Sequence, residues 1–234
     1  MSTTFMLSSN DADDAALEET GIEIPPEPHT LERFRSWIFS DEVPEKLPVS
    51  YLRGRILVDM SKEEILTHAE VKSEIGIVLG HLLRTLDFGK FYINGVLLTN
   101  IDADVSNNPD MVGMSWETIE RGKVRFVGRS KNRESEIEGS PDWVLEIVSR
   151  SSVVKDKRDL RQAYHEAGIR EYWIVDARGE EIEFEILHWR KSGYVSASEK
   201  EGWRRSRVFP YFFRLTRKRD RRGGWRYNLE TKDA

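Results

Sequence analysis

The chain has 234 residues, 38% of them hydrophobic and 10% aromatic, which is enough to bury a core of its own. It contains no cysteine, and this excludes disulfide bonds and thiolate metal sites. No apolar run approaches the roughly 18–20 residues that span a membrane, and the first residues lack the pattern of a signal peptide. We therefore expect a cytoplasmic α/β protein without a membrane partner.

The formal net charge of −5 hides two oppositely charged ends. Residues 1–28 carry seven acidic side chains and no Lys or Arg, a composition that predicts disorder. From Trp203 onward, eleven Lys or Arg face three acids. A basic end beside aromatic residues is typical of nucleic-acid binding, and a solvated tail is the alternative. We expect a disordered segment over 1–28, a folded domain over 29–200 and a basic extension over 201–234.

The first predicted elements are a helix in HTLERFRSWIFS (29–40) and two short strands in SYLRGRILVDM (50–60). A longer helix is predicted from Ser61, where Glu64 three positions later completes a capping box. Its apolar residues recur at helical spacing over 71–86, as in a helix that packs on a sheet.

Strands and helices alternate along the rest of the chain. Apolar and β-branched runs predict strands at 90–100, 108–115, 141–149, 170–176 and 182–190. Helices are predicted at 116–122 and from Lys155 to Gly168, and short strands at 193–197 and 202–209 extend the pattern. This alternation indicates a mixed central sheet flanked by helices, with an antiparallel carboxyl-terminal extension.

Two carboxylates, Asp142 and Glu146, interrupt the apolar strand in GSPDWVLEIVSRSS. A carboxylate beside apolar neighbours is costly to bury unless it is paired or holds a cation. Asp110 precedes another predicted strand, so Asp110 and Glu146 converge if the two strands are neighbours. Two carboxylates with waters suit Mg²⁺, which activates water for phosphodiester hydrolysis. The alternative for each Pro-Asp is a turn in which the aspartate accepts local backbone hydrogen bonds.

Positive charge follows this strand closely. A lysine here could orient water or stabilise a transition state, whereas an ordinary solvated helix start is the alternative. The residues concerned are Arg150, Lys155, Lys157, Arg158 and Arg161.

Four stretches in series resemble the Uma-type family of restriction-endonuclease-like proteins, within the PD-(D/E)XK nuclease superfamily. They are HAEVKSEIGIVLGHLL, NNPDMVGMSWETIERG, PDWVLEIVSRSSVVKD and AYHEAGIREYWIVDARG, and the resemblance covers about Ser50 to Val195. It implies an α/β (α+β) restriction-endonuclease-like core, a mixed sheet between helices, and a nuclease that hydrolyses DNA with Mg²⁺ (or Mn²⁺).

Carried over by position, the resemblance makes Asp110 and Glu146 metal ligands, and Glu74 a helix acid that completes the metal or water shell. Asp142 stands four residues before Glu146 on one strand, about 13 Å away, and is interpreted as a supporting residue.

The superfamily pattern has a lysine two residues after Glu146, where this chain has Val148. We expect Lys155 to supply the amine, with Lys157 as second choice. The absent lysine also favours a rival hypothesis, a degenerate module that binds nucleic acid or protein without cutting. A third hypothesis is an enzyme acting on another phosphate-containing substrate.

The expected partner is DNA, whose phosphates Arg158, Arg217, Lys218 and Arg219 would hold. A homodimer is allowed by the sequence. His68 falls on the apolar side of its predicted helix and is interpreted as a packed residue.

Overall fold

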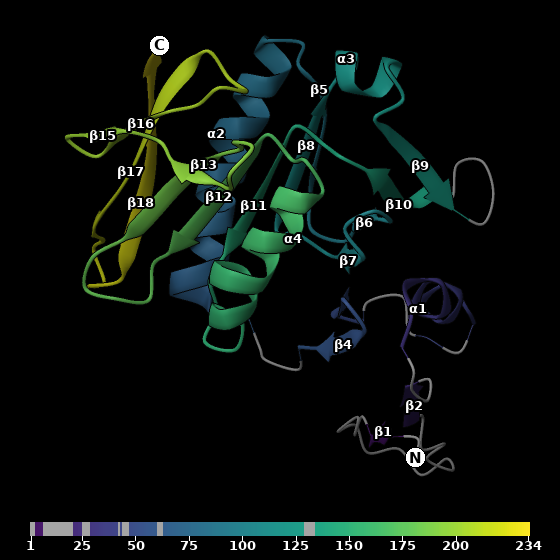
Figure 1. The fold of residues 1–234 in the computed structure, drawn as a ribbon. Helices are drawn as coiled ribbons and strands as arrows, with labels where there is room; N and C mark the ends of the chain where they lie inside the picture. Colours follow the sequence, from purple (N-terminus) through teal and green to yellow (C-terminus); the bar gives the residue numbers. More distant parts are fainter. Residues whose placement is uncertain are drawn as a thin grey trace.

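The structure is a computed structural model that describes residues 3–6, 21–24, 29–41, 43, 47–59, 63–128 and 134–234. Its centre is a six-stranded sheet in the order β14-β13-β12-β11-β8-β5 (Figure 1). Strand β11 pairs in parallel with β12 and antiparallel with β8, so the sheet is mixed. The strands are β5 (Gly89–Ile93), β8 (Met111–Ser115), β11 (Trp143–Ile147), β12 (Glu171–Asp176), β13 (Glu183–His188) and β14 (Val195–Ser196).

Helices cover both faces of this sheet. On one face lies α2 (Glu70–Thr85), which continues a π-helical turn, η1 (Ile65–Ala69). On the other lies α4 (Arg161–Glu166), which continues a second π-helical turn, η2 (Lys155–Leu160); α4 stands in front of the sheet and α2 behind it in Figure 1. Alternate residues of β11 therefore enter two different cores, and the whole strand is buried.

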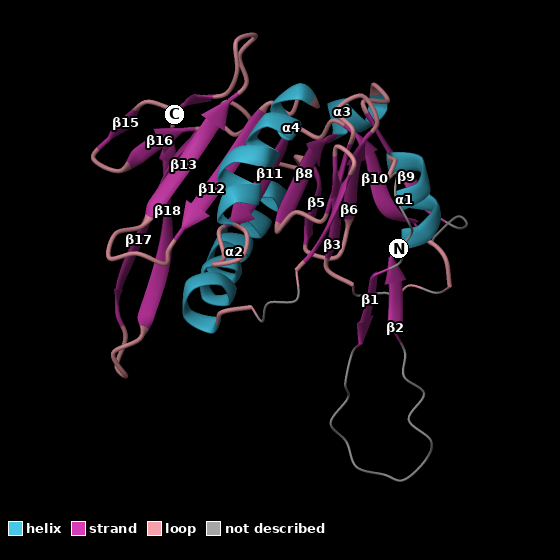
Figure 2. Cartoon of the chain, turned by 60° about the horizontal axis from the view of Figure 1, so that its bottom comes forward, coloured by secondary structure: helices cyan, strands magenta, loops and turns pink. Residues whose placement is uncertain are grey.

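A second six-stranded sheet, in the order β4-β3-β7-β6-β10-β9, lies beside the first (Figure 2). Helix α1 (Leu31–Ile38) is joined to it by Arg35, which pairs with Glu136 and Glu138 at 2.7 Å each. Helix α3 (Trp116–Glu120) begins directly after β8. The strands are β3 (Val49–Leu52), β4 (Arg55–Val58), β6 (Leu97–Asn100), β7 (Val105–Asn107), β9 (Val124–Gly128) and β10 (Glu134–Gly139).

The carboxyl-terminal residues form an antiparallel sheet in the order β15-β16-β17-β18. Its inward side chains, Phe213, Leu215, Tyr227 and Leu229, share a core with α2, so this sheet packs as part of the same unit. The strands are β15 (Glu199–Lys200), β16 (Trp203–Arg205), β17 (Tyr211–Arg219) and β18 (Trp225–Asp233). The predicted fold class, a mixed sheet flanked by helices with an antiparallel carboxyl-terminal extension, is confirmed.

Some predicted boundaries differ. The run 90–100 is two strands of different sheets, because Asn94 and Gly95 adopt positive φ (54° and 73°) and turn the chain. The helix begins at Ile65, and Ser61 of the expected capping box lies outside the described residues. Strands β9 and β10 were not predicted from the sequence, because β10 buries Glu136 and Glu138, whose charges Arg35 and Arg125 neutralise from other elements.

Most of the acidic segment 1–28 also lies outside the described residues. Within it, β1 (Thr3–Met6) pairs antiparallel with β2 (Gly21–Ile24). None of the helices in the described part of the chain is long and apolar enough to cross a membrane.

Candidate active site

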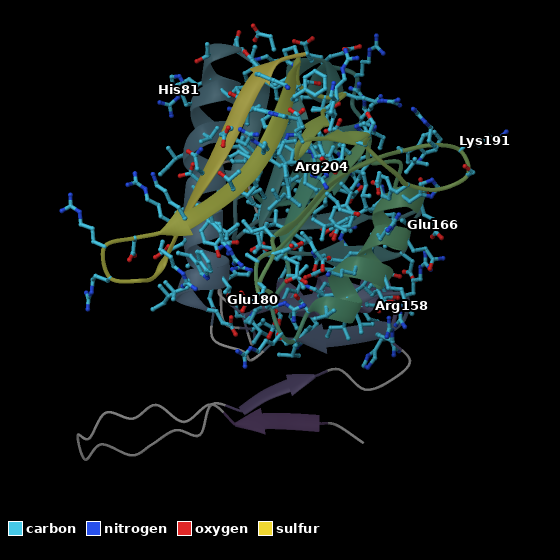
Figure 3. All side chains as sticks on the ribbon, turned by 90° about the vertical axis from the view of Figure 1, so that its left-hand side faces the viewer. His81, Arg158, Glu166, Glu180, Lys191 and Arg204 are labelled. Carbon is cyan, nitrogen blue, oxygen red and sulfur yellow. The ribbon has the colours of Figure 1, made fainter. Side chains whose placement is uncertain are left out.

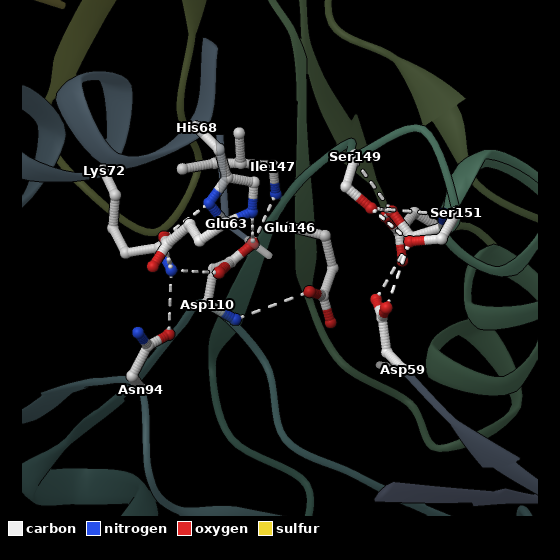
Figure 4. A network of polar contacts seen from close by, with 12 residues as sticks. Asp59, Glu63, His68, Lys72, Asn94, Asp110, Glu146, Ile147, Ser149 and Ser151 are labelled. Atoms are coloured by element: carbon white, nitrogen blue, oxygen red, sulfur yellow. Dashed lines mark hydrogen bonds and ion pairs between the residues drawn. The ribbon is translucent and has the colours of Figure 1, made fainter. Parts of the chain in front are cut away.

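Asp110 and Glu146 lie opposite each other on neighbouring strands. Because β8 and β11 are antiparallel with Met111 opposite Leu145, the residue before β8 faces the residue after Leu145. The Ile147 N–H donates to Asp110 Oδ2 at 2.7 Å, and the Asp110 N–H donates to Glu146 Oε2 at 3.4 Å (Figure 4). Two carboxylates distant in sequence therefore meet at one end of the central sheet.

Glu146 is held by hydrogen bonds on one side of its carboxylate. Oε1 accepts from Asn107 Nδ2 at 2.8 Å and from the Tyr164 hydroxyl at 2.7 Å. Burial raises the pKa of Glu146 well above its ordinary value, and the Asp156 and Asp110 charges add to this rise. The buried carboxylate would be favoured in its charged form by a nearby cation.

The Asp110 carboxylate contacts two cationic side chains of the helix before it. Lys72 Nζ lies 2.8 Å from Oδ1, and His68 Nε2 lies 3.3 Å from Oδ2. Glu63 Oε1 accepts from both cations at 2.6 Å, and Asn94 Oδ1 accepts from Lys72 at 3.2 Å. Burial alone would raise the pKa of Asp110, but the two cations outweigh it and lower the pKa.

Lys72 and His68 were missed as site residues, and His68 does not serve as packing alone. They stand four positions apart, on one face of η1 and α2, and that face meets the end of β8. Burial would lower both pKa values, yet the Asp110 carboxylate raises them, so both side chains favour their charged forms. The sequence feature that could have identified them is their spacing of four residues, which places both polar side chains beside the apolar stripe of the helix.

Glu74 does not join the pair of carboxylates. Two positions beyond Lys72 it points about 200° around the helix, away from Asp110. Its Oε1 accepts a hydrogen bond from the Leu229 N–H at 2.9 Å, so it fixes β18 to α2 instead.

Lys155 interacts electrostatically with the carboxylates of Glu146 and Asp110. Burial would lower the pKa of Lys155, but the charges of Glu146, Asp156 and Asp110 raise it. The ammonium form of Lys155 is therefore favoured. Lys157 is occupied elsewhere, with Asp176 at 2.8 Å and Glu183 at 2.7 Å. Lys155 also lines a cavity of about 360 Å³, whose wall includes Ser50, Arg55, Asp59, Ser151, Ser152 and Asp159.

Val148 and Asp142 contribute to packing and strand connection. Val148 is 1% exposed and lies in the core beside α4, where its N–H donates to the Val175 carbonyl at 2.8 Å. Asp142 accepts from the Ser115 N–H at 2.7 Å and from Arg170 at 3.0 Å, and so ties two strands at their far end.

The four basic residues expected to hold DNA have different surroundings. Arg158 pairs with the neighbouring Asp159 at 2.7 Å. Arg217 donates to three carbonyls of the turn after β12, and Arg219 donates to a carbonyl of its own hairpin. Lys218 is exposed on the other face of β17.

The comparisons with known proteins identify a family and a fold. A family model described as "Uma2: Putative restriction endonuclease" matches residues 31–217. The chain belongs to the Uma2 family. A crystal structure of a DUF820 protein from Anabaena variabilis, described as a putative nuclease, has the same fold: TM-score 0.55, 19% identity, covering 76% of this chain and 89% of that chain. A search of curated proteins found no match.

The family model describes its members as putative restriction endonucleases, and nucleases of this kind typically depend on a metal ion. Within the ranges that the structure describes, no three His, Asp or Glu side chains form a ready-made metal cage. Mg²⁺ is usually bound by one or two carboxylates, with waters and substrate phosphates as its other ligands. The donor set of Asp110 and Glu146 fits that mode of binding.

Proposed function

We propose that this Uma2 protein is an endonuclease that hydrolyses DNA phosphodiester bonds with Mg²⁺ or Mn²⁺. The observation that carries the proposal is the meeting of Asp110 and Glu146 at one end of the sheet. Asp110 Oδ2 accepts from the Ile147 N–H at 2.7 Å, Glu146 Oε2 accepts from the Asp110 N–H at 3.4 Å, and Lys72 Nζ lies 2.8 Å from Asp110 Oδ1. Membership of a family described as "Putative restriction endonuclease" supports the same reaction.

Asp110 and Glu146 would hold the metal, which when bound acts as a Lewis acid and lowers the pKa of a water ligand. Asn107 and Tyr164 fix the Glu146 carboxylate through Oε1 and leave Oε2 on the side of Asp110. The site is pre-organised in this way, so little reordering of side chains opposes the reaction.

Two lysines, Lys72 and Lys155, are candidates for the catalytic role of the superfamily lysine. Lys72 contacts Asp110 directly, whereas Lys155 interacts with Glu146 through its charge and lines the cavity of about 360 Å³. In our proposal Lys72 neutralises charge beside Asp110, and Lys155 holds a substrate phosphate. Lys72→Met should lower the cleavage rate about 100-fold with unchanged KM, and Lys155→Met should chiefly raise KM. The reverse pattern would exchange the two roles.

The proposal is tested by incubating supercoiled plasmid with purified protein and Mg²⁺ or Mn²⁺. Glu146→Gln keeps the shape of the side chain and the hydrogen bonds from Asn107 and Tyr164 to Oε1, but it removes the charge and the acceptor at Oε2. It should abolish nicking while the protein stays folded. Glu74→Gln is the matched control, since it neutralises a carboxylate outside the site and should leave nicking intact. Full activity of Glu146→Gln would refute the site, and parallel assays on RNA and nucleotides test the substrate class.

The second candidate function is a nuclease-fold module that binds without cutting, which Val148 in place of the superfamily lysine favours. Calorimetric titration with Mn²⁺ separates the two functions. Binding by the wild type that Asp110→Ala weakens supports the enzyme; an absence of binding, or equal binding by the variant, supports the module.

A further inference from the structure

The antiparallel carboxyl-terminal sheet has one face in the core and one directed outward. Because Phe213, Leu215, Tyr227 and Leu229 point inward, the alternate residues point away from the core. Figure 3 views the molecule from the side of this sheet, with β17 and β18 in front of α2. We call this surface the outer face; it consists of Trp203, Arg205, Phe212, Arg214, Thr216, Lys218, Arg226, Asn228, Glu230 and Lys232.

The outer face is strongly cationic. It carries five Lys or Arg and one acid, Glu230, which is paired with Arg214 at 2.5 Å. Lys218 stands directly opposite Arg226 in the strand register. Like charges placed opposite each other destabilise a sheet, so this arrangement costs folding free energy that an anionic ligand would offset.

At the other end of the outer face, the rings of Trp203 and Phe212 contact two cationic side chains. Lys232 Nζ lies 4.3 Å from the Trp203 ring centroid and 5.3 Å from that of Phe212. The Arg214 guanidinium lies 4.6 Å from the Trp203 centroid. Cation–π contacts of this kind reduce the freedom of the charged groups before a ligand arrives. Because the rings already stack with cations, the face offers positive charge more than stacking surface for bases.

The outer face is attached to the helix that serves the site. Glu74 of α2 accepts a hydrogen bond from the Leu229 N–H, and Glu74, Lys218 and Arg226 are among the residues that line a recess of about 280 Å³. The same helix carries Lys72 to Asp110. From Phe212 to Lys218 the face spans roughly 20 Å, about the length of six base pairs.

We propose that the outer face binds the phosphate backbone of nucleic acid outside the active site, without reading its sequence. The inference deepens the proposed function by assigning the surface that would retain the substrate. It replaces Arg217 and Arg219, which are committed to carbonyls of the chain itself, with Lys218, Arg226, Arg205 and Lys232.

The test measures DNA binding by fluorescence anisotropy in full-length Glu146→Gln protein, which cannot cut its ligand in our proposal. The probe is a labelled 20-base-pair duplex, titrated between about 50 and 200 mM salt. Replacing Lys218 and Arg226 together by Ala should weaken binding at least about tenfold at the low salt concentration. It should also reduce the slope of log K against log salt by about 2, one unit for each lost phosphate contact.

The matched control is the Arg190→Ala, Lys191→Ala double variant, which loses the same charge from an exposed loop; Lys191 is labelled far from the hairpin in Figure 3. The control should keep the parental affinity and slope, and duplexes of different sequence should bind alike. Equal losses in both double variants, or none in either, would overturn the proposal. So would a Lys218, Arg226 variant that loses binding to phosphatidylserine vesicles but not to DNA, because the partner would then be a membrane.

This experiment separates the two proposals. Salt-dependent binding that requires Lys218 and Arg226, in a wild type that cuts no DNA, would support the outer face and refute the nuclease. Cleavage by the wild type with no effect of the two substitutions on binding or KM would do the opposite.

Discussion

Asp156 allows a quantitative test of how burial acts on charges beside the site. Its side chain is 1% exposed, and Oδ2 accepts a hydrogen bond from the Ser152 hydroxyl. Oδ1 accepts no hydrogen bond from any described residue, and Lys155 Nζ is 3.6 Å away. Burial therefore outweighs the attraction of Lys155 and raises the pKa of Asp156 from 3.8 to about 6.

The sign of the effect on stability follows from linkage. The folded chain binds this proton more tightly than the unfolded chain, so the contribution is fully present below pH 3.8 and is lost as the pH rises through about 6. A shift of about two units corresponds to about 3 kcal/mol. Asp156→Asn imitates the neutral acid, and it should raise the free energy of unfolding by about 2–3 kcal/mol at about pH 8. At about pH 3.5 the gain should vanish.

Urea unfolding in EDTA at both pH values measures this difference. Asp159→Asn is the control of opposite sign, because Arg158 and Arg55 lower the pKa of Asp159. That substitution should cost less than about 1 kcal/mol at about pH 8, since the ion pairs lie at the surface, and the cost should shrink as the pH falls. A loss of stability in Asp156→Asn at the higher pH would refute the reasoning and show that the attraction of Lys155 outweighs burial.

Three further outcomes can be measured. Tyr164→Phe removes one of two donors to Glu146 Oε1 and should lower the free energy of unfolding by about 1–2 kcal/mol, together with kcat, as chemical denaturation and single-turnover cleavage would show. Gly113→Ala places a Cβ 2.2 Å from the Trp143 indole nitrogen and should cost about 3 kcal/mol or more, with a lower Tm and an altered tryptophan near-UV spectrum. Lys218→Glu removes a like-charged cross-strand pair and should raise Tm slightly while weakening DNA binding; a lower Tm would contradict the repulsion that we infer.

Membership of the Uma2 family bears on four side chains that our proposal places in the active site. The family model covers Asp110, Glu146, Lys72 and Lys155, so the residues to which our proposal assigns activity lie inside the matched range. In our proposal Val148, at the position of the superfamily lysine, is compatible with catalysis, because Lys72 contacts Asp110 and the Lys155 ammonium interacts electrostatically with Glu146. The lysine variants and the Mn²⁺ titration together distinguish an enzyme from a binding module.

The sequence by itself determined which acids to suspect. An acid within an apolar strand is costly wherever that strand packs, so Glu146 stood out before its neighbours were known. Local periodicity likewise sufficed to predict α2, β11 and β12, because each repeats its own pattern of buried residues.

Tertiary structure alone decided which groups surround these acids. The direction of Glu74, the arrival of His68 and Lys72 at Asp110, and the burial of β10 beneath Arg35 depend on which element covers each face. Periodicity states that a face is apolar or polar, but it does not state which partner lies opposite. The sequence therefore does not tell whether a polar residue beside an apolar stripe faces solvent or a buried partner. For Lys72 the fold decides this, because Asp110, directly before β8, places its carboxylate against the lysine.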